Sequence, residues 1–191
     1  MASDLAVDIA WQPLTPGERR TLLALARDAI GTALQGAPLP AVASPSPALL
    51  RPTAAFVSLH IGATLRGCVG TVTADRPLYI AVAETARSAA FDDPRFPPLN
   101  DAELRATSIE ISRLGPLVPV RPEQVEPGLH GVCIRFNEHR GLFLPQVATR
   151  YQWDRVTLLD ELCLKAMLPP DAWRSPAAEL LVFEAEVFEE Q

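Results

Sequence analysis

Three segments of the chain repeat apolar residues at the spacing of an amphipathic helix. The first begins at Thr15, which can cap a helix and form a capping box with Glu18. The second begins at residues 75–77 and is broken by the prolines of residues 91–99, and the third begins at residues 154–157. The stripes predicted to be buried are Leu22, Ala26, Ala29, Ile30 and Ala33; Leu78, Val82, Thr85, Ala86 and Ala89; and Leu158, Leu159, Leu162, Cys163 and Ala166.

Other segments alternate apolar and polar residues, which predicts strands with one buried face. Residues 61–63 are typical of a hairpin turn between the first two of them. The tail "LLVFEAEVFEE" is predicted to be one strand with Phe183, Ala185 and Val187 facing inward and Glu184 and Glu186 outward. The expected strands are residues 55–60, a return strand from residue 65, and residues 106–114, 129–136, 141–144 and 180–190.

The predicted order of elements is α-β-β-α-β-β-β-α-β. Hairpin-linked strands with helices between the groups favour an α+β fold with a mostly antiparallel sheet and flanking helices. Residues 37–52 and 115–128 are proline-rich and are predicted to be a loop and a connector. Residues 1–191 suit a single domain, which can have two lobes.

Composition excludes several classes of function. The formal net charge is −6, which argues against nucleic acid and against anionic membranes as partners, because both require basic surfaces. The first residues have neither a positive region nor a long apolar run, so we expect no signal peptide, and no apolar run reaches membrane-spanning length. Three cysteines do not form a disulfide framework. We therefore expect a soluble cytoplasmic protein.

The segment "TLRGCVGTV", residues 64–72, is the strongest candidate for chemistry. Gly67 and Gly70 flank Cys68 and allow a sharp turn or a close approach of another group. Arg66, two residues away, would share a strand face with Cys68 and favour its thiolate. Cys68 is then a candidate nucleophile, although a redox or metal ligand, or a small buried side chain, is an open alternative.

A second candidate is "FDDPRF", in which Asp92, Asp93 and Arg95 could orient an ionic ligand or tune Cys68. The alternative is a structural corner in which the aspartates cap main-chain amides and pair with Arg95. His60 is the histidine most easily brought near Cys68 as a partner, because it precedes the hairpin turn. The sequence has none of the spacings typical of metal sites, so we assign no metal-binding residues, and it identifies no particular cofactor.

Several motifs occur in an order that resembles the AMMECR domain family, whose prokaryotic members are often called AmmeMemoRadiSam system protein A. The resemblance runs from about residue 18 to the C-terminus, with Val69 where the family motif LRGCIG has isoleucine, and with "SLHIGAT" where a lysine-rich hairpin is common. The motifs are "LRGCVGTV", "AFDDPRFPPL", "IEISRLGPL", "GLFLPQVA", "LCLKAMLPPDAW" and "FEAEVFEE".

The resemblance implies an α+β fold in two lobes, with the LRGCVG segment lining a cleft between them. It also implies association with MEMO-like and radical-SAM proteins, without implying a particular reaction. Two hypotheses follow. The protein is an enzyme or a subunit of a modification system centred on Cys68, with Arg66, Asp92, Asp93 and Arg95 organising the pocket, or it is a non-catalytic adaptor or ligand-binding module.

Overall fold

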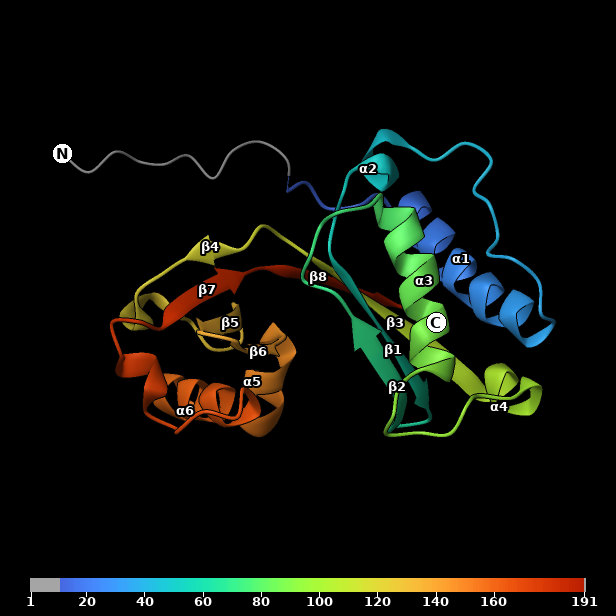
Figure 1. The fold of residues 1–191 in the computed structure, drawn as a ribbon. Coiled ribbons are helices and arrows are strands. Elements are labelled where there is room, and N and C mark those ends of the chain that lie inside the picture. Colours follow the sequence, from blue (N-terminus) through green and yellow to red (C-terminus); the bar gives the residue numbers. More distant parts are fainter. Residues whose placement is uncertain (1–10, 191) are drawn as a thin grey trace. The chain divides into compact units, whose positions relative to one another are not determined.

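A computed structural model of the chain describes residues 11–190, which form two compact units (Figure 1). Unit 1 is built from the chain up to Leu114 together with the stretch from Glu186 onward, and unit 2 is Gly115–Ala185. Each unit has its own four-stranded sheet and its own hydrophobic cluster. The α+β class expected from the sequence is confirmed, with the strands divided between two sheets.

Unit 1 has the strand order β2-β1-β3-β8, which leaves β2 and β8 as its edges. The pairs β1–β2 and β1–β3 are antiparallel. Helices α1 and α3 cover one face of this sheet (Figure 1). The elements are α1 (Pro16–Leu34), α2 (Pro47–Leu50), β1 (Ala55–Ile61), β2 (Thr64–Gly70), α3 (Leu78–Phe91), α4 (Asp101–Ala106), β3 (Thr107–Leu114) and β8 (Ala185–Glu189).

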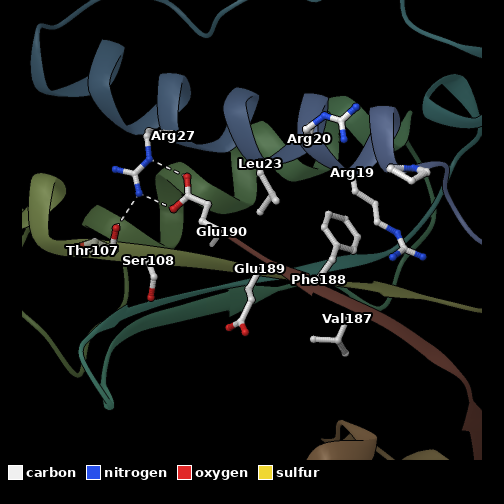
Figure 2. Close-up of a pocket in the computed structure, with 11 residues that line it drawn as sticks. Arg19, Arg20, Leu23, Arg27, Thr107, Ser108, Val187, Phe188, Glu189 and Glu190 are labelled. Carbon is white, nitrogen blue, oxygen red and sulfur yellow. Dashed lines mark hydrogen bonds and ion pairs between the residues drawn. The ribbon is translucent and has the colours of Figure 1, made fainter.

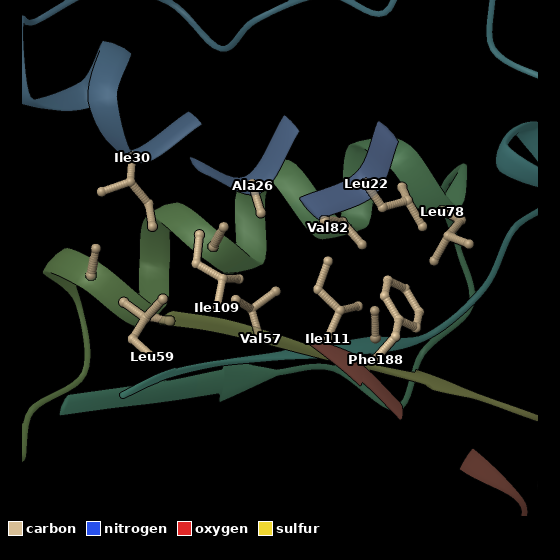
Figure 3. Packing of buried hydrophobic residues seen from close by; sticks show 14 of the residues in the cluster. Leu22, Ala26, Ile30, Val57, Leu59, Leu78, Val82, Ile109, Ile111 and Phe188 are labelled. Atoms are coloured by element: carbon tan, nitrogen blue, oxygen red, sulfur yellow. The ribbon is translucent and has the colours of Figure 1, made fainter. Parts of the chain in front are cut away.

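The cluster of buried residues in unit 1 lies between the helices and one sheet face (Figure 3). Side chains from α1 and α3 meet alternate residues of β1 and β3, as the helical and strand periodicities predict. The predicted capping box between Thr15 and Glu18 is present and fixes the start of α1. The principal contacts are made by Leu22, Ala26 and Ile30 of α1, Leu78 and Val82 of α3, and Val57, Leu59, Ile109, Ile111 and Phe188 of the sheet.

Unit 2 has the strand order β4-β7-β5-β6, and its printed strand pairs are antiparallel. Helix α6 begins at Asp154, whose side chain accepts a hydrogen bond from the Thr157 amide, and its apolar stripe is buried as predicted. The elements are β4 (Val118–Pro119), η1 (Pro122–Gln124), β5 (Gly131–Phe136), β6 (His139–Phe143), α5 (Pro145–Tyr151), α6 (Arg155–Lys165), η2 (Ala172–Arg174) and β7 (Glu179–Phe183).

The proline-rich segments contain more structure than expected. Helix α2 lies within residues 37–52, because Pro47 fits the first turn of a helix, and β4 and η1 lie within residues 115–128. Two further helices, α4 and α5, were not predicted. Both are too short to display a helical period, and α4 depends on a capping box at Asn100.

The prediction of a single C-terminal strand is wrong. The tail forms β7 in the sheet of unit 2 and then β8 in the sheet of unit 1, with a break at Glu184. Beyond this break the predicted inward orientation of Val187 is wrong, because Val187 is 42% exposed and Phe188 is buried instead. A change of sheet ends the alternation, which is a signal only within one continuous strand.

Candidate functional site

The face of the unit 1 sheet opposite the helices carries a row of polar residues. Ser58 of β1 lies directly across from Cys68 of β2 on one side and from Glu110 of β3 on the other. Residues directly opposite in antiparallel strands point to the same face. The neighbouring residue Gly67 faces α3, and Leu59 and Ile109 belong to the core, so Cys68, Ser58 and Glu110 share the other face.

The Cys68 thiol is half-buried and has a defined polar partner. The hydroxyl of Ser58 donates a hydrogen bond to Cys68 Sγ over 3.2 Å. Ser58 itself is only 7% exposed, so its hydroxyl has little competition from water. This hydrogen bond fixes the sulfur relative to β1.

The main chain of Cys68 is held from outside the sheet by the loop after α3. Asp93 Oδ2 accepts the Cys68 amide over 2.9 Å, and Arg95 donates to the Cys68 carbonyl over 3.1 Å. The two side chains form an ion pair of 2.7 Å with each other. Together they satisfy the outward main-chain groups of an edge strand, which fixes the position of the cysteine in space.

Electrostatics around Asp93 are strong. The hydrogen bond from the Arg95 guanidinium, and then the amides of Cys68 and Arg95, hold the pKa of the Asp93 carboxyl well below its usual range, against the opposing effect of burial. The pKa of Arg95 is raised, first by its hydrogen bond with Asp93 and to a smaller extent by Cys68. Arg95 therefore lies beside the cysteine as one half of an ion pair with Asp93.

Arg66 has a different position from the one expected. Its guanidinium donates to Glu103 over 2.9 Å and to the Pro97 carbonyl over 2.9 Å, and it lies over the ring of Phe96. The pairing of β1 with β2 shifts between Leu59 and His60, so that Arg66 is the additional residue of a β-bulge. This bulge interrupts the two-residue alternation that placed Arg66 beside the thiol in the sequence analysis.

The two glycines do not form a bend, because both lie within β2. A Cβ on Gly67 would come within 2.1 Å of the carbonyl oxygen of Ala89, and one on Gly70 within 2.1 Å of the Phe56 ring. Close approach, the second use proposed for these glycines, is what the structure shows. The other alternative, a sharp turn at these glycines, is not formed.

Among residues 11–190, no hydrogen bond joins the other candidates to the thiol, whose partner is Ser58. Asp92 is an exposed residue at the C-terminus of α3. His60 lies on β1 two residues beyond Ser58, whereas His130 and His139 belong to unit 2 and hydrogen-bond main-chain groups there. Sequence reasoning missed Ser58 as the partner of Cys68. A hairpin around residues 62–63 without a bulge would have paired Cys68 with Val57 instead.

Residues 11–190 contain neither a metal-binding cluster nor a helix able to cross a membrane. No group of three or more histidine, cysteine, aspartate or glutamate side chains in this part of the chain could hold a metal ion. None of its helices combines the length and the apolar character needed to cross a bilayer.

Comparisons with known proteins place the chain in a family. The AMMECR1 family model matches residues 23–188. Protein MK0488 of Methanopyrus kandleri is 41% identical to this chain, and the alignment covers 94% of this chain and 92% of MK0488. A protein of Methanothermobacter thermautotrophicus is 37% identical, and the alignment covers 94% of this chain and 98% of that protein. The crystal structure of the uncharacterised protein PH0010 of Pyrococcus horikoshii is similar, with a TM-score of 0.89, 34% identity, and coverage of 93% of this chain and 94% of that one.

Proposed function

The chain belongs to the AMMECR1 family, and from that premise we propose that the protein is a thiol-dependent enzyme, or a subunit of one, in which Cys68 is the nucleophile. The names of its relatives state no reaction. The proposal therefore rests on the geometry around the sulfur atom.

The observation that carries the proposal is the hydrogen bond from Ser58 to Cys68 Sγ. A thiolate, and not a thiol, is the attacking form of cysteine. Ser58 supplies a hydrogen-bond donor to the sulfur, and the Asp93–Arg95 ion pair holds the Cys68 main chain. Cys133 and Cys163 differ from Cys68 in burial, which raises the pKa of each of these two thiols.

The arrangement favours attack on an electrophilic carbon. The sulfur electron pair would form an S–C bond, and the leaving group would depart with the electron pair of the bond that breaks. Asp93 and Arg95 hold the Cys68 main chain at both its amide and its carbonyl. Such fixation reduces the entropy that is lost when the nucleophile is brought into line with its target.

Alkylation with dilute iodoacetamide near neutral pH, followed by mass spectrometry, tests the proposal. We expect Cys68 to react faster than a cysteine in an unstructured peptide, while Cys133 and Cys163 of the same molecule react slowly. A rate at Cys68 no higher than that of the peptide thiol contradicts the proposal.

Paired variants identify the source of the reactivity. Ser58→Ala should slow alkylation of Cys68 by about 5-fold, which corresponds to one hydrogen bond of about 1 kcal/mol. Ser108→Ala, which removes a hydroxyl from β3 at a position paired with His60, should leave the rate unchanged. Equal rates in the two variants would show that Ser58 does not activate the thiol.

A complementation experiment separates catalysis from the adaptor alternative, in which the domain would dock MEMO-like or radical-SAM proteins. Cys68→Ser keeps the size of the side chain and removes the thiol. Loss of complementation by a stably folded Cys68→Ser protein supports a thiol-dependent function. Full complementation supports the adaptor and contradicts the enzyme.

A further inference from the structure

A groove of about 870 Å³ runs between α1 and β8 at one edge of the unit 1 sheet (Figure 2). Arg27 on its wall is neutralised by an ion pair with Glu190. Arg20 of α1 and Glu189 of β8 are both exposed and have no ion-pair or hydrogen-bonding partner among residues 11–190, and their charges are opposite. The charges of this groove therefore favour neither an anion nor a cation.

A smaller and more selective pocket lies at the opposite edge of the same sheet, between β2 and α3. Its volume is about 220 Å³, which is smaller than the pockets that hold drug-sized ligands, so it suits a small chemical group. Val69 and Ala81 provide apolar surface. The hydroxyl-bearing residues of the lining are Thr71, Thr85 and Ser88.

Gly70, the last residue of β2, lines this pocket and directs its main-chain groups out of the sheet. The Thr71 amide donates inward to the Ala55 carbonyl of β1, whereas the amide and carbonyl of Cys68 bond outward to the loop after α3. Alternate residues of an edge strand direct these groups to the same side, so those of Gly70 point outward like those of Cys68. Neither the amide nor the carbonyl of Gly70 has a hydrogen-bonding partner among residues 11–190.

The bonds made by Cys68 show what the outward groups of this edge require. Asp93 accepts the Cys68 amide and Arg95 donates to the Cys68 carbonyl, and their ion pair makes them one unit with an acceptor, a donor and no net charge. Gly70 presents the same two groups without such a unit. A carboxylate cannot donate and an ammonium cannot accept, whereas an amide does both.

A buried hydroxyl adds a further polar group to the pocket. Thr85 of α3 is only 7% exposed, and its hydroxyl has no hydrogen-bonding partner among residues 11–190. A buried hydroxyl without a partner is unfavourable. A polar ligand in the pocket can supply that partner, because a hydroxyl both donates and accepts.

The charged residues of the lining favour a ligand without charge. Arg76 and Glu84 form an ion pair with each other, and Arg76 also pairs with Asp75. An anion would meet two carboxylates, and a cation would compete with the arginine for them. A neutral ligand disturbs neither ion pair.

We propose that the pocket between β2 and α3 binds a neutral ligand through an amide group, which a small cyclic amide or a single peptide residue can supply. The carbonyl oxygen of the ligand accepts from the Gly70 amide, and its N–H donates to the Gly70 carbonyl. Gly70 is two residues from Cys68, about 7 Å along the strand, so the ligand lies beside the candidate nucleophile. The inference does not depend on the reactivity of Cys68.

Nuclear magnetic resonance of the isotope-labelled full chain tests the proposal, with pyrrolidinone as the small cyclic amide and N-acetylglycine methylamide as the peptide residue. We expect at least one of them to move the Gly70 amide signal in a saturable way. The Cys68 amide, which is already bonded to Asp93, should move less. The probe that binds identifies the source of the amide. A Gly70 signal that neither probe moves overturns the proposal.

Matched probes test the donor and the charge separately. The fully N-methylated form of each amide keeps the carbonyl and has no N–H, and we expect it to bind at least about 5-fold more weakly than its parent. Acetate only accepts and methylammonium only donates, so both should leave the Gly70 signal in place. Equal binding of an N-methylated probe and its parent, or tighter binding of either ion, overturns the assignment of a neutral amide.

Two pairs of variants test the lining of the pocket. Ser88→Leu places a larger side chain in the pocket and should abolish binding, whereas Arg87→Leu, at the next and exposed position of α3, should not. Thr85→Val removes the buried hydroxyl and should weaken binding by about 5-fold, whereas Thr21→Val on α1 should leave it unchanged.

Thermal unfolding shows whether each variant is folded. Thr85→Val should be at least as stable as the unmodified chain, because the hydroxyl it removes has no partner among residues 11–190. This variant therefore keeps the test valid even when Ser88→Leu does not fold. Unchanged affinity in folded Thr85→Val and Ser88→Leu proteins overturns the proposal.

Discussion

At the scale of single residues, Gly67 and Asp93 show how packing determines the geometry of the candidate site. The backbone of α3 lies against the Cα of Gly67, at a distance that leaves no room for a side chain. Asp93 is almost fully buried and joins the loop after α3 to the amide of Cys68. The thiol is therefore positioned by a helix contact on one side of β2 and by an ion pair at its edge.

Gly67→Ala should destabilise unit 1 by about 3 kcal/mol, because its Cβ would lie 2.1 Å from the Ala89 carbonyl oxygen and helix and strand would have to separate. Urea denaturation followed by circular dichroism measures the change. Gly17→Ala is the control, since the nearest atom to its Cβ would be 3.9 Å away, and we expect a change of less than about 1 kcal/mol. Similar effects of the two substitutions would contradict the close contact.

Asp93 should contribute stability that depends on pH. Its pKa in the folded protein is lowered, so the contribution is complete above the unfolded value of about 4 and is lost as the pH falls toward the folded value. Asp93→Asn should cost about 2 kcal/mol at pH 7. The difference between the two proteins, from denaturation at a series of pH values, should be constant from pH 7 to about pH 5 and shrink below pH 4. A difference that grows on acidification would contradict this assignment.

At the scale of elements, Glu186 ties three parts of unit 1 together. Its carboxylate accepts hydrogen bonds from the Leu14 amide before α1, from Arg19 within α1, and from Arg113 of β3. Arg113 and Glu186 are both nearly buried, with side-chain exposures of 7% and 11%. The entry to α1 and the strands β3 and β8 therefore depend on one carboxylate.

Glu186→Ala should destabilise the protein by about 3 kcal/mol, since it leaves the buried guanidinium of Arg113 without its carboxylate partner. Thermal unfolding measures the loss. Glu189→Ala serves as the matched control, because this neighbouring glutamate is exposed and its removal should change stability by less than about 0.5 kcal/mol. A loss of stability in Glu186→Ala as small as that in Glu189→Ala would contradict this prediction, because it would mean that water replaces the carboxylate beside Arg113 at little cost in free energy.

The elements also show what the sequence can and cannot reveal. Long periodic segments were predicted well: the buried faces of α1, α3 and α6 and the alternation of β1 and β3 all follow from spacing. Short elements such as α4 were missed, because caps and tertiary contacts stabilise them rather than periodicity.

For the candidate site, the sequence indicated Cys68 and the Asp93–Arg95 loop as neighbours worth testing, and these residues do meet. It could not indicate Ser58 as the hydroxyl donor. That pairing depends on a β-bulge, which changes the register by one residue and leaves no periodic trace in the sequence.

At the scale of the whole molecule, unit 2 is one continuous segment inserted between two parts of unit 1. The hydrophobic clusters centred on Leu22 and on Leu162 share no residue. Unit 1, by contrast, takes Phe188 and the carboxylate of Glu186 from the far end of the chain. A change at the C-terminus should therefore destabilise unit 1 more than unit 2.

Truncation after Ala185 should destabilise unit 1 and leave unit 2 folded, because it removes β8 with Phe188 and Glu186 but no residue of the unit 2 cluster. Hydrogen exchange with mass spectrometry reads the two units separately. Peptides from α1 and β3 should exchange quickly, while those from β5 and α6 should remain protected. Equal loss of protection in both units would show that they unfold as one.

The return of the last strand to the first sheet has a consequence for the nascent protein. A ribosome releases the chain from its N-terminus, so Gly115–Ala185 emerges complete before the final residues do. The sheet that begins to form first must wait, with the place of β8 unfilled, until Ala185–Glu189 has been made and has left the ribosome. During that interval the main chain of β3 is open to pairing with other strands, and errors of synthesis within β8 would leave it so.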